Sequence, residues 1–357
     1  MDRYWREIDG QQRRRAGEFP DLRFACPLGD PPAHSRPRPR WQRGPLRYWL
    51  YPWQARVASR RPGVRVVHVL DHSFGYLLKA VPARGVFRVA TLHDLAPLRE
   101  GGLTPGQMAR FRHSVECLRL ADLRLADSRH SADEAAALLD LAPDSIEVLP
   151  LGVDTGRFAA TAGGGAPAWR TRLAGRPVVL SVGTVIGRKN LAILPDVFRA
   201  LRTRLPAARP PALLRVGAPL PAELRDALLA VLGADGLVEL GPAPDDDLVA
   251  AYQGADALIF PSRLEGFGFP VLEAMAAGCP VVCTNVTSLP EVGGDAARYF
   301  APDDPDAAAA GLHTLLTDPA ARAAQVEAGR RQAARFSWER HFERLAEIYR
   351  RGVAGTP

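Results

Sequence analysis

Two glutamates eight residues apart, Glu265 and Glu273, lie in a segment whose glycines and prolines predict a loop followed by a helix. Pro270 suits the first turn of a helix, and the sequence Gly278-Cys279-Pro280 suits its end. We therefore expect Glu265 to lie in the loop and Glu273 to lie about one turn into the helix. The two carboxylates would then serve different parts of one ligand.

The same loop is suited to binding a phosphate group. Gly266 and Gly268 precede the expected helix, and the free N–H groups and the dipole at a helix N-terminus stabilise an anion. One carboxylate could accept hydrogen bonds from a sugar while the deeper one binds a ribose. Taken singly, these are ordinary loop and helix residues, but their combination favours a nucleotide-sugar site.

A second candidate site begins at the end of the apolar run Val178–Val182. It contains a glycine turn at Gly183 and Thr184, followed by Arg188 and Lys189, which we expect to open a helix. Arginine offers a planar fork and lysine a compact charge, so the pair could neutralise a leaving nucleoside diphosphate without a metal ion. The alternative is an exposed basic turn. Lys189 is one of only two lysines in the chain, which favours a function.

The N-terminal half carries polar residues at the ends of its expected strands, where open α/β sheets bind ligands. His93 follows the run Phe87–Leu92, and we interpret it as catalytic, although a lone histidine is more often structural. Similar positions, which suit either the acceptor side of a site or turn and cap residues, are held by Asp71, His72, Asp94, Ser128 and Arg129.

Strand-like runs alternate with helical stretches through nearly the whole chain, which predicts parallel sheets built from α/β units. The expected strands are 64–70, 87–92, 122–126, 146–149, 178–182, 213–216, 237–240, 257–260 and 281–284. The glycine-rich segment 161–167 resembles a linker. We expect an N-terminal domain over 1–165, a C-terminal domain over 166–336, and a last helix and tail over 337–357 that packs back on the N-terminal domain.

The Glu265 to Glu273 segment resembles the E-x7-E signature of glycosyltransferase family 4, the group 1 glycosyltransferases, and the resemblance extends over about residues 64 to 350. It implies a retaining enzyme of the GT-B fold, with two Rossmann-like domains facing a central cleft. The catalytic residues that it implies are His93, Arg188, Lys189 and Glu265. The donor-binding residues that it implies are Gly183, Thr184, Gly266, Phe267, Gly268, Phe269 and Glu273.

Two departures from the family pattern are visible. Thr184 stands where many relatives have an arginine, which leaves Arg188 as the expected cation. The family's usual first strand and glycine-rich loop are missing from this chain, which starts with a charged, helix-like stretch over 2–15. We therefore expect the first strand of the N-terminal domain to be absent.

The segments 91–95 and 282–291 look most like those of bacterial mannosyltransferases of polysaccharide assembly, which favours GDP-mannose over a UDP-linked sugar as the donor. The expected acceptor is a saccharide or a lipid-linked saccharide. Retention without an enzymic nucleophile implies that the acceptor attacks on the face that the diphosphate leaves. A nucleotide-sugar epimerase or hydrolase, and a non-catalytic nucleotide-sugar-binding homologue, remain alternatives.

Composition limits the remaining possibilities. The chain of 357 residues has a net charge of +7, almost entirely from arginine, and lacks a nucleic-acid-binding signature, so we expect an anionic substrate or membrane face as its partner and no nucleic acid. The absence of a long apolar run or signal segment predicts a cytoplasmic protein, with peripheral contact to the inner membrane face as an option. The four cysteines form no CxxC pair, which predicts buried thiols and no metal or other cofactor.

Overall fold

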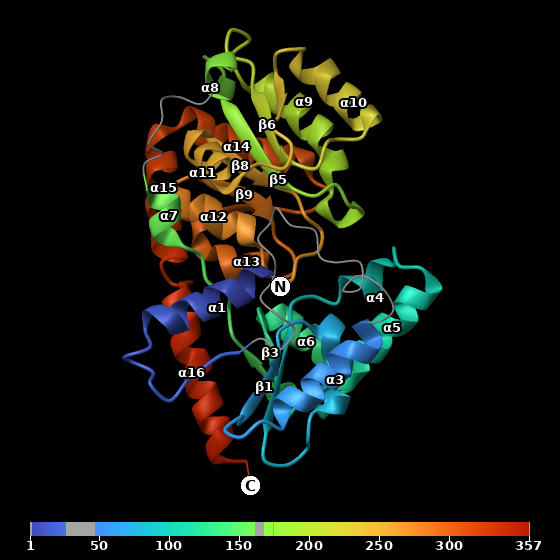
Figure 1. The fold of residues 1–357 in the computed structure, drawn as a ribbon. Helices are drawn as coiled ribbons and strands as arrows, with labels where there is room; N and C mark the ends of the chain where they lie inside the picture. Colours follow the sequence, from blue (N-terminus) through green and yellow to red (C-terminus); the bar gives the residue numbers. More distant parts are fainter. Residues whose placement is uncertain (1, 26–46, 161–167, 174, 357) are drawn as a thin grey trace. The chain divides into compact units, whose positions relative to one another are not determined.

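The computed structural model describes residues 2–25, 47–160, 168–173 and 175–356, and these residues form two compact units (Figure 1). The first unit extends to Gly152 and resumes at Trp338, and the second comprises Val153–Ser337. The division falls between Gly152 and Val153, earlier than the predicted boundary at residues 165 and 166. The predicted linker, 161–167, lies outside the described residues.

The first unit is built on a four-stranded parallel sheet of order β1-β2-β3-β4. Its strands are β1 (Val66–Val69), β2 (Phe87–Leu92), β3 (Leu123–Ala126) and β4 (Ile146–Val148). Among the described residues no strand precedes β1, and the first element is a helix, α1. The helices are α1 (Asp2–Arg14), α3 (Arg47–Ser59), η1 (His72–Ala80), α4 (Ala96–Glu100), α5 (Pro105–Glu116), η2 (Cys117–Leu120), α6 (Arg129–Leu139), η3 (Pro143–Ser145) and α16 (Trp338–Ala354).

Helix caps fix where the chain turns after β1 and after β3 of this unit. Asp71 accepts a hydrogen bond from the Ser73 amide and starts η1, and Ser128 accepts one from the Ser131 amide and starts α6. Thr104 opens α5 with a reciprocal capping box. The last helix, α16, contacts both α1 and β2, so it completes the first unit although it lies at the other end of the sequence.

The second unit contains a six-stranded parallel sheet of order β10-β9-β8-β5-β6-β7. Its strands are β5 (Val178–Gly183), β6 (Ala212–Gly217), β7 (Leu237–Glu239), β8 (Ala257–Phe260), β9 (Val281–Thr284) and β10 (Ala297–Phe300). Its helices are α7 (Thr155–Ala159), α8 (Ala168–Arg172), η4 (Gly187–Lys189), η5 (Leu191–Ile193), α9 (Leu194–Arg204), α10 (Ala222–Leu232), α11 (Asp245–Gly254), α12 (Phe269–Ala277), α13 (Leu289–Gly293), η6 (Gly294–Ala296), α14 (Pro305–Thr317) and α15 (Pro319–Ala333).

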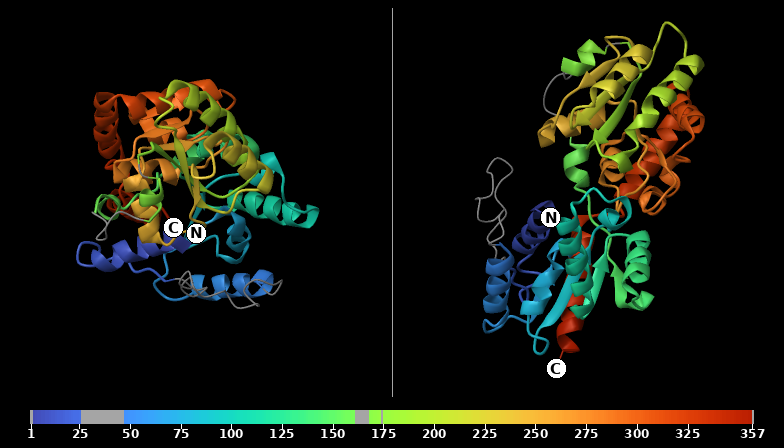
Figure 2. Two further views of the ribbon diagram at one scale, coloured as in Figure 1. Left: turned by 90° about the horizontal axis from the view of Figure 1, so that it is seen from above. Right: turned by 90° about the vertical axis from the view of Figure 1, so that its right-hand side faces the viewer.

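Helices cover both faces of this sheet, which explains why its strands are almost continuously apolar (Figure 2). On one face α9, α10 and α14 share a buried core with the strands. On the other face α12 contacts β8 and β9 and is itself covered by α11 and α15. Because α12 is enclosed in this way, every one of its side chains from Val271 to Ala277 is buried.

The nine predicted strands are confirmed, with ends that differ by one or two residues. The sequence missed β10, because Ala297-Arg298-Tyr299-Phe300 is a short edge strand in which only Phe300 is fully buried. The prediction of an α/β fold with two parallel sheets is therefore confirmed. No helix in the described part of the chain is long and apolar enough to cross a bilayer. Cys117, Cys279 and Cys283 are free and buried, as predicted, and Cys26 lies outside the described residues.

The ends of β5 and β6 approach each other so closely that a side chain at Gly217 would overlap the carbonyl oxygen of Gly183. Gly217 also has a φ of +130°, which disfavours any residue with a Cβ. We expect Gly217→Ala to lower the free energy of unfolding by about 3 kcal/mol or more, because the steric overlap and the backbone strain both destabilise the variant. Urea denaturation followed by circular dichroism measures this loss.

Gly233→Ala is the matched control, since Gly233 has a φ of +78° but open space around its Cβ position. This variant should show only the effect of backbone strain, a decrease of about 1–2 kcal/mol in the free energy of unfolding. Equal losses in the two variants would show that the close approach of β5 and β6 contributes nothing.

Candidate functional site

The polar residues of the second unit gather where the strand order of its sheet reverses. β5 and β8 are neighbours, but the chain proceeds outward from β5 to β6 and from β8 to β9. Open α/β sheets bind ligands outside the carboxyl ends of their strands at such a reversal. The two loops that sequence analysis selected start here, one after Gly183 at the end of β5 and the other after Phe260 at the end of β8.

These two loops bring Arg188, Lys189 and Glu265 together. The Lys189 Nζ atom lies 2.5 Å from Oε1 of Glu265, and Nη1 of Arg188 lies 3.5 Å from Oε2 of the same carboxylate. All three side chains are less than one fifth exposed. The loops are also joined through the backbone, since the Arg263 amide donates to the Arg188 carbonyl. Two cations around one carboxylate leave a net positive charge, which suits a diphosphate.

The local structure of the cations differs from the prediction that they open a helix. Arg188 and Lys189 lie in the short 3-10 turn η4, and α9 begins only at Leu194. Asn190 adopts a left-handed conformation with a φ of 52°, which interrupts the helical path, and its side-chain amide donates to the Pro302 carbonyl. The turn, rather than a helix, directs Lys189 toward Glu265.

The glycine loop leads into α12 as predicted. Gly268 has a φ of +108° and directly precedes Phe269, the first residue of the helix, with Pro270 in its first turn. The hydroxyl of Ser288 donates to the carbonyls of Glu265 and Phe267, and the Thr287 hydroxyl accepts from the Glu265 amide. Sequence analysis did not identify Thr287 and Ser288 as supports of this loop.

The glycine loop is also packed by its aromatic residues, because Phe267 and Phe269 meet edge to face with ring centres 5.3 Å apart. Phe267 is buried, as is Gly266, so the loop has little freedom to move away from the start of α12. The predicted donor-binding residues Gly266 to Phe269 therefore form one fixed turn at the helix N-terminus.

Glu273 lies in the middle of α12 and is only 4% exposed. The hydroxyl of Tyr252, from α11, donates to its Oε2 at 3.0 Å. A buried carboxylate needs such a partner, because desolvation otherwise destabilises its charge. Tyr252 was missed by sequence analysis, since nothing in its neighbourhood marks it as more than a core aromatic residue.

Arg215 is a second residue that the sequence did not reveal, although an arginine inside the apolar run of β6 was a visible signal. It is 1% exposed and donates to the carbonyls of Ser181, Val216 and Gly183. Burial lowers the pKa of its guanidinium to about 10. Arg215 thus holds the carbonyl of Gly183, at the start of the turn that contains Thr184.

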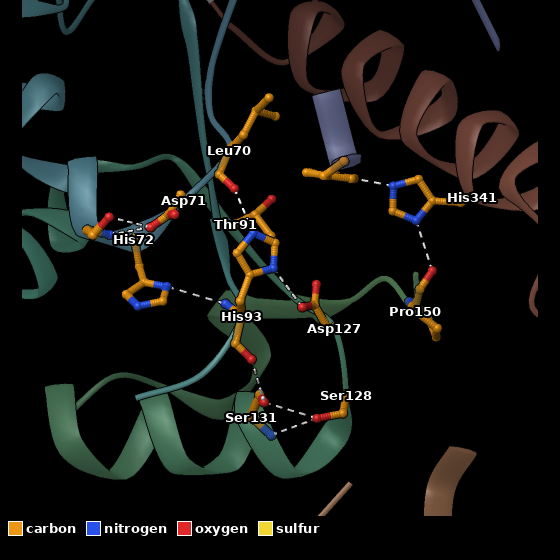
Figure 3. A network of polar contacts seen from close by, with 12 residues as sticks. Leu70, Asp71, His72, Thr91, His93, Asp127, Ser128, Ser131, Pro150 and His341 are labelled. Atoms are coloured by element: carbon orange, nitrogen blue, oxygen red, sulfur yellow. Dashed lines mark hydrogen bonds and ion pairs between the residues drawn. The ribbon is translucent and has the colours of Figure 1, made fainter. Parts of the chain in front are cut away.

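In the first unit, His93 lies at the end of β2 and contacts two oxygen atoms (Figure 3). Its Nδ1 lies 2.7 Å from Oδ2 of Asp127, and its Nε2 lies 2.8 Å from the Leu70 carbonyl. A carboxylate and a carbonyl both accept, so both ring nitrogens donate and the ring is an imidazolium. Burial disfavours this charge, but the attraction and hydrogen bond of Asp127 outweigh it and raise the pKa of His93 to about 9.

The His93 ring is covered by Tyr4 from α1, with the two ring centres 5.8 Å apart. The Tyr4 hydroxyl lies 3.1 Å from Nε2 of His341, whose Nδ1 lies 2.8 Å from the Pro150 carbonyl (Figure 3). His68 joins the same buried network through Thr91 and Tyr349. Burial lowers the pKa of His68 to about 3 and that of His341 to about 4, so both rings are neutral.

The other strand-end residues of this unit make local contacts. Asp71 and Ser128 cap η1 and α6, and Oδ1 of Asp94 accepts from the Ala96 amide. His72 is buried, with its Nδ1 atom 3.4 Å from the His93 amide, and Arg129 is the exposed first residue of α6. Their acceptor-side role stays a prediction. Asp127, which directly follows β3, was not selected although it occupies the same kind of position.

Comparisons with known proteins agree with this arrangement. Residues 12–157 match the sequence model described as Glycosyltransferase Family 4, and residues 169–332 match that of Glycosyl transferases group 1. The chain is 32% identical over 276 residues to O-antigen chain mannosyltransferase B of Escherichia coli, covering 76% of this chain and 72% of that protein. It is 33% identical over 320 residues to a D-inositol 3-phosphate glycosyltransferase of Salinispora arenicola, covering 84% and 71%.

Solved structures show the same fold at low sequence identity. Sucrose-phosphate synthase from Thermosynechococcus elongatus is 23% identical with a TM-score of 0.69, and the match covers 88% of this chain and 83% of that one. The Anabaena protein HepE, crystallised with UDP and glucose, is 20% identical with a TM-score of 0.67, over 85% and 83%. These neighbours are GT-B glycosyltransferases, so the predicted fold is confirmed.

The His93 network predicts that stability has a maximum near pH 6.5. The pKa of His93 is raised on folding, so its contribution is complete below about pH 6.5 and is lost as the pH rises through about 9, an effect of at most about 3 kcal/mol. The pKa values of His68, His72 and His341 are lowered, so these groups destabilise the fold as the pH falls below about 6.5. Asp71 and Tyr4 also face this network.

Chemical denaturation of the wild type and Asp127→Asn between pH 5 and 10 checks this expectation, since the amide removes the charge that raises the pKa of His93. The variant should lose the decline above pH 6.5. Asp133→Asn, at an exposed position on α6, is the control and should keep the wild-type profile. An unchanged alkaline limb in Asp127→Asn would disprove the assignment of the charge to the His93–Asp127 pair.

Proposed function

The chain belongs to the group 1, family 4 glycosyltransferases, and from that premise we propose that it is a retaining, metal-independent enzyme that transfers mannose from GDP-mannose. Transfer of a sugar from a nucleotide sugar is the activity of the family. The acceptor that we propose is a saccharide or a lipid-linked saccharide, met at the inner face of a membrane. Likeness to an O-antigen chain mannosyltransferase supports the choice of sugar and a place in polysaccharide assembly.

The observation that carries the proposal is the cluster of Arg188, Lys189 and Glu265 at the strand-order reversal. Two cations meet one carboxylate where the two loops come together, and both cations lie within reach of a diphosphate bound there. The N-terminus of α12 adds backbone N–H groups and the positive end of the helix dipole, which suit a phosphate. Glu273 of α12, which accepts from the Tyr252 hydroxyl of α11, supplies an acceptor for a ribose hydroxyl.

In the proposed reaction, the bond between the anomeric carbon and the diphosphate oxygen breaks, and the acceptor oxygen forms its new bond on the same face of the sugar. The acceptor's proton passes to an oxygen of the leaving diphosphate. The protein's part is electrostatic: Arg188 and Lys189 stabilise the charge that develops on the diphosphate, and Glu265 accepts hydrogen bonds from the sugar. Charges that the fold already holds in place are effective because they do not have to reorient as the reaction proceeds.

In the proposed reaction His93 acts through its backbone carbonyl rather than through its imidazole ring. Both of its N–H groups are already used by Asp127 and the Leu70 carbonyl. We therefore assign its backbone carbonyl, which accepts from the Ser131 hydroxyl at 3.3 Å and retains a second lone pair, to a hydroxyl of the sugar. The Asp127 carboxylate then acts by holding the ring and hence the backbone at the end of β2.

Donor binding and transfer without added metal test the proposal. Calorimetry with GDP-mannose, UDP-glucose and UDP-N-acetylglucosamine should show binding of GDP-mannose, and this binding should be lost in Lys189→Ala. We expect both Lys189→Ala and Glu265→Ala to reduce the transfer rate by about 100-fold or more, since each removes a charge that faces the reacting groups. Arg199→Ala, on the exposed side of α9, should transfer at the wild-type rate.

Other outcomes select other functions. A free or isomerised sugar as the only product would identify a hydrolase or epimerase, and tight donor binding with no turnover would identify a non-catalytic homologue. Preference for UDP-glucose would keep the glycosyltransferase and replace mannose. Wild-type turnover in both variants would overturn the residue assignments.

A further inference from the structure

Helix α3 carries an apolar stripe that no other described part of the first unit covers. Trp49, Trp53 and Val57 are 82%, 61% and 42% exposed, and their spacing of four residues places them on one face of the helix. The opposite face is packed into the unit through Tyr51 and Ala55, which are buried. Three of the six exposed large hydrophobic side chains in the described chain therefore lie in a single row.

The charges beside this stripe are of one sign. The segment Tyr48–Leu70 contains four arginines and no acidic residue. Arg56 and Arg60 are exposed and follow Trp53 and Val57 by three residues, with Arg56 on the helix and Arg60 directly after its last residue. An exposed apolar row beside arginines offers an anionic membrane both apolar contact and charge attraction.

A groove next to the stripe repeats the same chemistry. It has a volume of about 750 Å³ and lies between α3, η1 and α5, with Trp53, Tyr48 and Tyr76 among its aromatic lining residues. Arg56, Lys79 and Arg110 also line it, and none of its lining residues is acidic. The Arg110 guanidinium lies 5.9 Å from the Tyr48 ring centre, and the Lys79 Nζ atom lies 3.1 Å from Nε2 of His113. The groove thus offers cations to a phosphate.

We propose that α3 and this groove form the surface by which the first unit docks on an anionic lipid bilayer. The two tryptophans enter the interfacial layer, where their rings find both apolar chains and polar headgroups, and the cations of the groove bind lipid phosphates. A second copy of the chain is the poorer occupant, because pairing this face with itself would bring arginines against arginines. The inference rests on the proposed function, in which the acceptor is met at a membrane, but the contacts that it describes lie outside the catalytic site.

Co-sedimentation with phosphatidylcholine vesicles, with and without phosphatidylglycerol, tests the proposal on the full-length chain. The wild type should bind only the anionic vesicles and should dissociate as salt is added. Trp49→Ser/Trp53→Ser and Arg56→Glu/Arg60→Glu should each weaken binding by about tenfold or more, through lost apolar burial and lost charge attraction respectively. The matched controls are Leu138→Ser and Arg209→Glu, which alter an exposed apolar residue of α6 and an exposed arginine of the second unit.

Vesicle binding and sugar transfer are measured in separate assays, so either proposal can be overturned without the other. Transfer to a soluble acceptor without vesicles should be the same in all these variants, and circular dichroism should show that they are folded. Failure of the wild type to bind anionic vesicles, or equal binding by the double-tryptophan variant, would overturn the membrane surface while leaving the transferase intact. Light scattering that shows a dimer dispersed by Trp49→Ser/Trp53→Ser would assign the face to a second copy and would also overturn it.

Discussion

A carboxylate that is almost removed from water must be neutralised, and this requirement organises the second unit around Glu265. Lys189 and Arg188 come from the loop after β5, so their pairing with Glu265 joins the two strands at which the sheet order reverses. Removing one partner from such a pair commonly costs about 3–5 kcal/mol, because the other charge stays buried. The interaction that suits the site to a diphosphate therefore also holds its loops together.

The same solution recurs at two other buried charges of the described chain. Arg215 is surrounded by backbone carbonyls at the ends of β5 and β6, and the His93 imidazolium is held between Asp127 and a carbonyl. Each charge fixes backbone at the carboxyl end of a strand, where a ligand binds in this class of fold. Several hydrogen bonds to each charge make these strand ends rigid, which favours a preorganised site over an adaptable one.

The surface of α3 follows the opposite rule, because its tryptophans and arginines are left facing water rather than paired inside the first unit. Apolar side chains of that size are normally buried, since each exposes a large area to solvent. Family membership therefore accounts for the buried charges of the site but not for this exposed row. The candidate site thus depends on charges that are buried and paired, whereas the α3 surface combines apolar side chains and charges that are exposed to water.

The sequence by itself determined the nine strands, the helix that begins at Phe269 and the positions of Glu265 and Glu273, because periodicity, glycine and proline act over a few residues. Only the tertiary structure decided which distant residues meet. Nothing near Tyr252, Asp127 or Ser288 in the chain predicts their bonds to Glu273, His93 and the Glu265 loop. Such partners come from different elements, and their contacts exist only once packing has excluded water and made each unpaired polar group costly.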